Sequence, residues 1–300
     1  ALGRGYDGDS DGTVSVGDGL AVFDRNSNEQ INSEFDQKPW GDIFFNTMVV
    51  SFYIRPCGDP VTYQAYNPAT DKDEIKSCSS YTYVNSNIKN WTGGWYVVNN
   101  SGTFNEPVTV TGDVALIIEN GKTLNALAGI QVRQPATLTI YGQPEGEEPA
   151  GKLIATANAA SRAGIGSTGD GYNGGAVTIH GCDVVATGGK NAAGIGGGQN
   201  GAGSTISLYG GTLTATAGAG APRAIGAGYY TDLWHGNGNF AIRKNRVLRN
   251  LETQEIIGNN PYIDDWSDLL EGTTLSIGLT QQEPIAYRYY NENMEPVDAE

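Results

Sequence analysis

The sequence predicts an all-β protein whose central region is a coil of stacked parallel strands, and three observations support this. One short phrase recurs with isoleucine at positions 165, 195 and 225, an even step of thirty residues. A second phrase, residues 177–187, recurs at 206–216 and more loosely from Leu138, where an insert interrupts it. Within each phrase the apolar residues stand two apart, which is the period of a strand and not of a helix.

A unit this short cannot enclose a hydrophobic core of its own, so neighbouring units must cover its inward residues. We therefore expect Ile165, Ile195 and Ile225 to stack as an interior ladder. Three more ladders are expected at the other matching positions: Leu138, Val177 and Ile206; Leu153, Val184 and Leu213; Ala155, Ala186 and Ala215. Paired glycines at the corners supply turns with positive φ. The predicted fold is a parallel β-helix, for which right-handed winding is the commoner form.

Further segments carry the same pattern before the repeats, at residues 95–99, 112–118 and 129–132, and the pattern ends near Gly228. Together they resemble the glycine-rich parallel β-helix segments, carbohydrate-binding or adhesin-like and pectin-lyase-like, of secreted and surface proteins of gut Gram-positive bacteria. The resemblance implies an extracellular or cell-surface location and a polysaccharide or host glycan as partner. It leaves the activity open, because one fold hosts many functions.

Composition agrees with this fold class and narrows the partners. The chain has 43 glycines and 16 tyrosines but 2 methionines, a mixture typical of turns and strands. Its formal charge of -15 disfavours nucleic acid and anionic lipid as partners. It has no run of about 18 apolar residues, so we expect no membrane insertion. Residues 1–4 lack the features of a signal peptide, as the start of a trimmed chain would.

We expect four parts along the chain: a calcium loop at 1–24, an N-terminal cap or small β-rich domain at 25–104, the parallel β-helix at 105–228, and a C-terminal cap at 229–300. An apolar run at 43–54 predicts one or two buried strands in the second part. In the last part, 263–270 predicts a short helix or turn, 274–277 a strand, and 294–300 a frayed end.

The spacing of oxygen-bearing residues in the segment 7–18 is typical of a loop that wraps Ca²⁺. Gly12 takes the sharp turn at loop position 6, and Val14 is the hydrophobic residue at position 8. The expected metal ligands, with Thr13 contributing its carbonyl, are Asp7, Asp9, Asp11, Thr13, Ser15 and Asp18. Residues 17–23 predict the start of an exit helix.

Aspartate at the last ligand position, where an EF-hand has glutamate, is similar to the calcium loops of dockerin modules, which attach secreted bacterial enzymes to scaffold proteins. Dockerins carry two such loops and this chain carries one. The pattern therefore favours a structural Ca²⁺ that pins the N-terminal part over a docking module. The alternative is an acidic turn that holds no ion.

Aromatic residues gather just before the repeats and allow two interpretations. Exposed tyrosine and tryptophan rings are surfaces on which sugar rings stack. The candidate ligand-binding residues on this interpretation are Trp91, Trp95, Tyr96, Tyr81 and Tyr83. The alternative, which the sequence favours, is that these residues and the nearby Tyr63 and Tyr66 cover the open end of the coil.

The coil carries few groups able to do chemistry. Asp170, His180 and Asp183 lie in or beside one unit. In the next unit Thr212 stands at the position of Asp183, and Tyr209 at that of His180. Lyases and hydrolases built on such coils need clustered carboxylates, so we assign no catalytic residue. A non-catalytic module that binds glycans or mediates adhesion is the first hypothesis; a polysaccharide lyase or glycoside hydrolase, and a structural stalk, are the alternatives.

Cysteines and basic residues add two smaller expectations. Cys57 and Cys78 could form a bridge in an oxidising compartment, whereas Cys182 is a small residue at a corner of the coil. The spacing of the cysteines is not that of a zinc site. Four basic residues gather between 243 and 249; they either form a solvated cap or pair with the acidic surface elsewhere.

Overall fold

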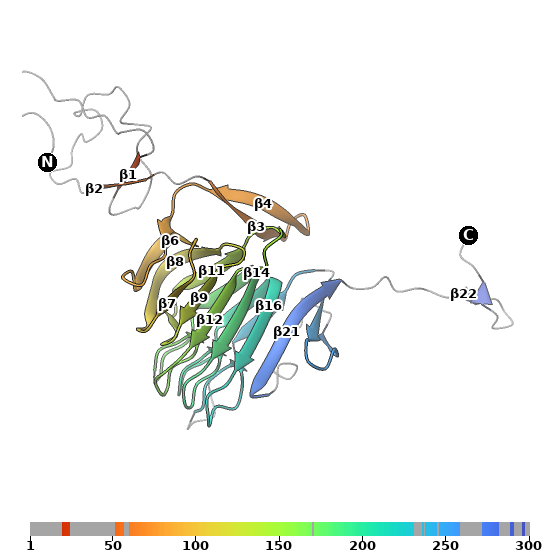
Figure 1. Ribbon diagram of the computed structural model, residues 1–300. Helices are drawn as coiled ribbons and strands as arrows, with labels where there is room; N and C mark the ends of the chain where they lie inside the picture. Colours follow the sequence, from red (N-terminus) through yellow and green to blue (C-terminus); the bar gives the residue numbers. More distant parts are fainter. Residues whose placement is uncertain are drawn as a thin grey trace, which may run out of the picture.

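The computed structural model of the chain describes residues 20–24, 52–56, 60–169, 171–230, 236, 238–244, 246–258, 272–281, 289–290 and 296–297. Every regular element in these residues is a strand, so the described part of the chain is all-β, as predicted. Most strands belong to one 17-stranded, mostly parallel sheet (Figure 1). None of these residues forms a helix that could span a membrane.

The large sheet contains three rows of parallel strands, to which the chain returns in turn. The first row is built from residues 90–92 of β6 (Asn90–Val98), 108–111 of β8 (Val108–Ile118), β10 (Ile130–Val132), β13 (Ile165–Gly166), β15 (Ile195–Gly196) and β17 (Ile225–Gly226). Its later members are strands of two residues, the Ile-Gly step of each repeat.

The second row follows the first along the chain. It consists of β5 (Thr82–Tyr83), the second halves of β6 and β8, β11 (Thr137–Gly142), the first halves of β14 (Ala176–Thr187) and β16 (Thr205–Thr216), and β18 (Asn239–Ile242). The parallel rows therefore extend on both sides of the predicted region 105–228.

The third row lies one corner further along each unit. It consists of β7 (Gly102–Phe104), β9 (Thr123–Ala126), β12 (Lys152–Thr156) and the second halves of β14 and β16. Buried and half-buried residues alternate along strands of the second and third rows, for example through all of β11 and β12. This alternation is expected where one face of a strand meets a core and the other does not.

The register confirms the ladders predicted from the repeats. Ile165 pairs with Ile195, and Ile195 pairs with Ile225; all three are at most 4% exposed. The other predicted ladders are in register as well: Leu138, Val177, Ile206; Leu153, Val184, Leu213; Ala155, Ala186, Ala215. Burial of each large aliphatic side chain contributes about 1.5–3 kcal/mol, so the repeated positions supply much of the core.

A hairpin formed by β3 (Val61–Asn67) and β4 (Lys72–Cys78) lies on the outer side of the second row. Figure 1 shows β3 beside β11 and β14, which it contacts. Val97 and Ile117 point away from the main core, yet they are fully buried because Val61, Tyr63 and Ala65 of the hairpin cover them. The protein thus has a second, smaller hydrophobic layer.

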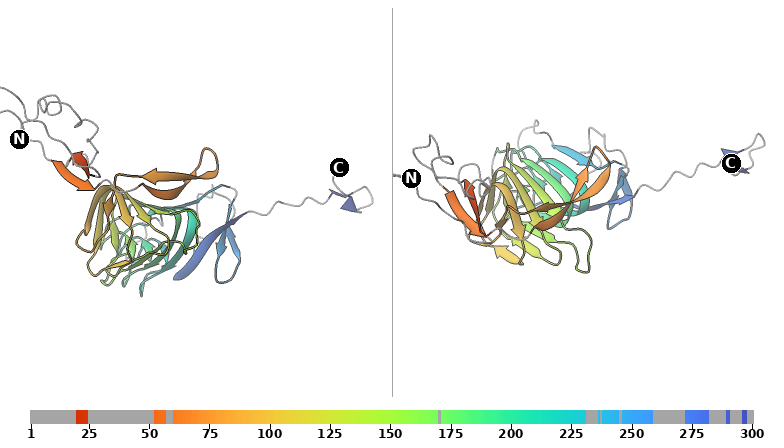
Figure 2. Two further views of the ribbon diagram at one scale, coloured as in Figure 1. Left: turned by 45° about the horizontal axis from the view of Figure 1, so that its top comes forward. Right: turned by 90° about the horizontal axis from the view of Figure 1, so that it is seen from above.

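The C-terminal strands extend the third row with the opposite direction. β21 (Thr274–Gln281), which contains the strand predicted at 274–277, pairs antiparallel with the end of β16. β19 (Arg246–Asn250) pairs antiparallel with β21, and β20 (Ile256–Gly258) with β19. Leu248, Leu275 and Ile277 are buried in the main core, so these strands cover its end (Figure 2).

Two short pairs of strands complete the described residues. β1 (Leu20–Asp24) pairs antiparallel with β2 (Phe52–Pro56), so the exit helix expected at 17–23 is wrong for residues 20–23. Pairing with β2 overrides the helical interpretation of a short sequence. β22 (Tyr289–Tyr290) pairs with β23 (Pro296–Val297), which lies within the segment expected to fray. The predicted helix or turn at 263–270 lies outside the described residues.

Candidate functional site

Successive units differ at the corner between the second and third rows. Ile140 and Lys152 of one unit pair with Ile179 and Asp183 of the next. Segment 141–151 therefore spans the corner that 180–182 spans one unit later and 209–211 spans in the unit after that. The additional residues form a loop between β11 and β12, which we call the insert loop (residues 143–151). This loop is the insert that interrupts the repeat in the sequence.

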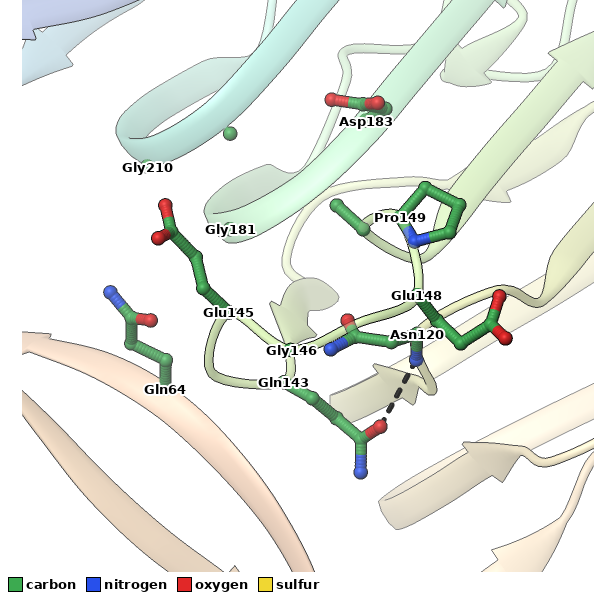
Figure 3. A pocket seen from close by; sticks show the side chains of 12 residues that line it. Gln64, Asn120, Gln143, Glu145, Gly146, Glu148, Pro149, Gly181, Asp183 and Gly210 are labelled. Atoms are coloured by element: carbon green, nitrogen blue, oxygen red, sulfur yellow. Dashed lines mark hydrogen bonds between the residues drawn. The ribbon is translucent and has the colours of Figure 1, made fainter.

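The insert loop forms one wall of a pocket of about 430 Å³ (Figure 3). The corners at Gly181 and Gly210 lie opposite the loop, and Gln64 comes from the β3–β4 hairpin. The full lining consists of Gln64, Asn120, Gln143, Glu145, Gly146, Glu148, Pro149, Ala150, Gly181, Asp183, Gly210 and Gly211. The pocket thus joins residues from the insert, the hairpin and two later units.

The lining is polar and negatively charged. Its side chains offer three carboxylates, from Glu145, Glu148 and Asp183, and three carboxamides, from Gln64, Asn120 and Gln143. Among the described residues that line it there is no lysine, arginine or histidine. Carboxylate oxygens accept hydrogen bonds, and carboxamides both donate and accept them, which suits a ligand with several hydroxyl groups. The charge disfavours anionic ligands.

Hydrogen bonds hold the insert loop against its neighbours. The backbone N–H of Asn120 donates to Oε1 of Gln143 at 3.0 Å, and its side-chain Nδ2 donates to the carbonyl oxygen of Pro144 at 2.8 Å. At the far end of the loop, Gly121 N–H donates to the carbonyl oxygen of Pro149 at 2.7 Å. The loop is therefore ordered before a ligand arrives, which lowers the entropic cost of binding.

Asp183 and Asn120 differ in whether their side-chain oxygens have hydrogen-bond partners. Asp183 Oδ1 accepts a hydrogen bond from Thr212 Oγ1 at 2.7 Å, so the residue that replaces it in the next unit also orients it. Oδ1 of Asn120 is buried and has no hydrogen-bond partner among the described residues. An unsatisfied buried acceptor is costly, so this atom is a place where a ligand or water hydroxyl would stabilise the pocket.

The predicted sugar platform is wrong for its buried members. Trp91 is 0% exposed; its Nε1–H donates to the carbonyl oxygen of Ile88 at 3.1 Å, and its ring stacks on Tyr96 at 5.3 Å. Tyr96 is also buried and accepts a hydrogen bond from the Thr92 N–H through its hydroxyl. Both rings belong to the main core, because they stand at inward positions of β6. They offer no face to a sugar.

The remaining platform residues are not brought together with the pocket. Tyr81 is buried in the layer beneath the hairpin, and its hydroxyl lies 3.1 Å from that of Tyr83. Trp95 is half-buried between Tyr63 and Tyr141. Of the five predicted ligand-binding residues, Tyr83 alone is strongly exposed, at 44%. None of the five lines the pocket described above.

An aromatic row that was not predicted lies on the outer side of the second row of strands. It consists of Trp95, Tyr141, His180 and Tyr209, whose neighbouring rings lie 4.9–5.4 Å apart. Tyr63 and Tyr66 of the hairpin pack against it. The only signal was that an aromatic ring or imidazole precedes a corner glycine in three units. What covers the row depends on a hairpin far away in the sequence.

The predicted metal site lies outside the described residues, and so do Asp7, Asp9, Asp11, Thr13, Ser15 and Asp18. Within the residues that the structure describes, no group of three or more histidine, cysteine, aspartate or glutamate side chains could hold a metal ion. Asp170 is also outside the described residues. The calcium loop therefore stays a prediction.

Two cysteines are described. Cys182 is buried, its Sγ–H donates to the carbonyl oxygen of Tyr141 at 3.1 Å, and burial raises the pKa of its thiol, which keeps it protonated. Sγ of Cys78 lies 3.3 Å from the carbonyl oxygen of Ser80. Cys57 lies outside the described residues, so its bridge to Cys78 stays a prediction.

Comparison of the chain with protein-family models, with curated proteins and with solved structures finds no match. The chemistry of the candidate site must therefore be inferred from its own groups. These are a preformed polar pocket, three carboxylates, three carboxamides, and corner glycines that leave backbone groups accessible.

Proposed function

We propose that the chain is a non-catalytic module of a secreted or cell-surface protein, and that the pocket beneath the insert loop binds a glycan. The observation that carries this proposal is the insert itself. At the corner between the second and third rows, segment 141–151 stands where the next two units have three residues each, and the added residues build a polar pocket there. In repeat proteins, insertions between repeated strands commonly lie on the binding face.

The three rows of strands are, on this proposal, the faces of a right-handed parallel β-helix. Support comes from ladders of identical or similar residues that run through successive units. A rigid column of this kind suits a module that displays a site away from a surface. The secreted or surface location, like adhesion, rests on the resemblance of the repeats and on nothing else in the chain.

The lining favours neutral or amino sugars over uronic acids. Glu145, Glu148 and Asp183 would repel a carboxylated or sulfated sugar, whereas they accept hydrogen bonds from hydroxyl and ammonium groups. The net charge of -15 acts in the same direction over a longer range. We expect weak binding, because the described lining residues include no aromatic ring for a sugar face.

Deletion of residues 143–150 tests the pocket without disturbing the rest of the coil. It leaves Tyr141-Gly142-Gly151, the same three residues as the natural corner Tyr209-Gly210-Gly211. We expect the shortened chain to keep its far-ultraviolet circular dichroism and its cooperative unfolding, and to lose binding to every glycan that the intact chain retains on an array. Equal binding by the two chains would contradict the proposal.

A glycoside hydrolase is the second candidate, because the pocket gathers the carboxyl groups that acid–base cleavage requires. Release of new reducing ends from a bound polysaccharide would support it. The variants Glu145→Gln, Glu148→Gln and Asp183→Asn would then lower turnover by at least about 10²-fold while glycan binding persists. Turnover that survives all three changes would exclude this pocket as the active site. A purely structural stalk predicts neither binding nor turnover.

The proposal also includes a Ca²⁺ ion bound by the loop at residues 7–18. The spacing of Asp7, Asp9 and Asp11 with Asp18 supports a bound ion that fixes the segment before β1. The ion has a structural role here, with no part in glycan binding.

A further inference from the structure

The β3–β4 hairpin is attached to the second row through a buried histidine. The backbone N–H of Tyr66 donates to Nδ1 of His180 at 3.0 Å, and His180 is 9% exposed. A nitrogen that accepts a hydrogen bond carries no proton, so the contact requires the neutral imidazole with its proton on Nε2. The partners are 114 residues apart in the chain, which makes this a tertiary contact and not a local turn.

The imidazole is enclosed on several sides by rings. It stacks on Tyr141 of β11, with centroids 4.9 Å apart and an interplanar angle of 13°, and it contacts Tyr209 of β16 at 5.2 Å. Tyr66 of β3 packs against Tyr209 at 5.1 Å. No ring nitrogen can therefore gain a proton without placing a cation in this apolar stack.

The charged groups near the imidazole come from the hairpin and from the segment after β18. Asp73 and Lys76 belong to β4, and Asp71 lies in the turn, where it accepts a hydrogen bond from the Tyr66 hydroxyl at 2.8 Å. Arg243 and Lys244 follow β18. Arg243 is buried, its Nη1 lies 2.9 Å from Asp73, and its guanidinium lies 4.4 Å from the ring centre of Tyr66.

We propose that the β3–β4 hairpin is an acid-released strap, which leaves the second row of strands when His180 takes up a proton on Nδ1. The proton converts the acceptor of the Tyr66 N–H into a second donor, so two donors face each other. It also places an imidazolium near the Arg243 guanidinium inside the aromatic stack. Detachment relieves both conflicts, because the imidazolium then reaches water.

Release of the strap changes the pocket and uncovers a new surface. Gln64 is a lining residue, and the carbonyl oxygen of Thr62 accepts a hydrogen bond from Gln143 Nε2 at 3.4 Å, so one wall of the pocket leaves with the hairpin. Tyr141, His180 and Tyr209 then face solvent. The strap operates whether or not the pocket binds a glycan.

The direction of the pH effect follows from the burial of the imidazole. Desolvation lowers the pKa of His180 from 6.5 to about 4; Asp73 opposes this shift, whereas Arg243 and Lys76 add to it. With the strap open, the pKa returns toward its ordinary value. The open state thus binds more protons than the closed state between these two values. The contact stabilises the closed strap fully above pH 6.5, and this contribution is lost as the pH falls toward 4.

Hydrogen exchange of the full chain between pH 7 and pH 4 measures the opening. After correction for the intrinsic pH dependence of exchange, we expect the opening equilibrium for amides 61–78 to rise on the order of 100-fold across this interval. Amides of the parallel ladders, such as Ile179 and Leu208, stay protected. Simultaneous loss of protection in the ladders would overturn the proposal, since the whole molecule would then be unfolding.

Two variants separate the histidine from the nearby ion pair. His180→Asn replaces Nδ1 by an amide oxygen, which can accept from the Tyr66 N–H but does not titrate, so its strap should show no rise above pH 4.5. Asp73→Asn removes the ion pair with Arg243 and should keep the rise between pH 6.5 and 4.5. A pH profile of His180→Asn that matches the unmodified chain would overturn the assignment to His180.

Direct titration of the imidazole provides an answer even if His180→Asn does not fold. The chain has 2 histidines, so the ¹⁵N resonances of the His180 ring can be followed in the unmodified protein. We expect Nδ1 to be unprotonated at pH 7 and to titrate together with the loss of amide protection in 61–78. Titration near pH 6.5 while those amides stay protected would exclude the strap.

Discussion

At the scale of single residues, the glycines that follow the ladder isoleucines allow successive units to approach closely. Gly166, Gly196 and Gly226 have φ values of 137°, 131° and 127°. A Cβ on Gly196 would lie 2.1 Å from the carbonyl oxygen of Gly226. The backbone of each unit can therefore approach the next only where there is no side chain, which is why the repeat keeps an Ile-Gly pair.

The variant Gly196→Ala tests this packing. We expect it to lower the free energy of unfolding by at least about 3 kcal/mol, because backbone strain is added to a clash that the neighbouring unit cannot relieve. Gly169→Ala is the matched control, since Gly169 also has positive φ but nothing within 4 Å of its Cβ position. Denaturant unfolding of both variants gives the comparison. Equal losses would mean that strain alone, and not stacking, selects glycine.

Single residues also mark the limit of prediction from the sequence. The inward ladder positions were correctly predicted, because strand period and repeat spacing both identify them. His180 was given no catalytic role from the sequence, and its partner was not predicted, because it accepts a hydrogen bond from a hairpin that no local pattern connects to it. Arg243 was assigned to a basic cluster, either solvated or paired; it is buried and paired with Asp73.

At the scale of elements, the β3–β4 hairpin is held at its far end by the Arg243–Asp73 ion pair. Arg243 donates from Nη1 to both carboxylate oxygens of Asp73 at 2.9 Å and also reaches the carbonyl oxygen of Tyr209 at 3.4 Å. Its side chain is 8% exposed and that of Asp73 is 32% exposed. Such a pair costs more to break than an exposed one, because one partner is left without a counter-ion in a partly buried place.

We expect Arg243→Ala to lower stability by about 2 kcal/mol and to speed exchange of amides 61–78 at neutral pH. The control is Lys89→Ala, which removes an ion pair with Glu106 in which both side chains are more exposed. That change should cost less than about 1 kcal/mol and leave the hairpin protected. Thermal unfolding and hydrogen exchange measure the two effects. A hairpin that stays closed in Arg243→Ala would show that the aromatic contacts suffice.

The N-terminal loop is the second element with a direct test. Ca²⁺ that binds the folded chain raises the midpoint temperature of thermal unfolding. At a concentration 100 times the dissociation constant, the bound ion adds about 2.7 kcal/mol to the free energy of unfolding. The double variant Asp9→Ala/Asp11→Ala should lose the shift, whereas Asp113→Ala, which removes a carboxylate far along the chain, should keep it. If the unmodified chain shows no shift with Ca²⁺, the predicted loop is an acidic turn without an ion.

The position of the insert loop could be predicted from the sequence, but its part in a pocket could not. Its existence was evident, because it interrupts an otherwise even alignment of units. Its role was not, since the pocket needs Gln64 from the hairpin and the corners at Gly181 and Gly210 of later units. These residues converge only once the register of the rows is known. Glu145 and Glu148 could therefore not be recognised as site residues from the carboxylates of any single unit.

At the scale of the whole molecule, repetition made the architecture predictable and irregularity made the function hard to predict. The rows of strands follow from spacing, glycine corners and alternating burial. The aromatic residues before the repeats were expected either to cover the open end of the coil or to form a sugar platform. Trp91 and Tyr96 instead lie in the main core, and Tyr63 and Tyr81 lie in the smaller layer beneath the hairpin. The features that distinguish this chain are additions to the rows: the β3–β4 hairpin, the insert loop and the antiparallel C-terminal strands.

The closing strands also bear on how such molecules meet one another. In the third row, the edge of β16 is occupied by β21, which runs in the opposite direction and is itself paired with β19. A second copy of the chain could extend the parallel row at this edge only by pairing a parallel strand with β16, and β21 already occupies that edge. The third row therefore ends within the chain itself, at an antiparallel strand. This arrangement opposes end-to-end assembly of several chains into a fibre through this edge.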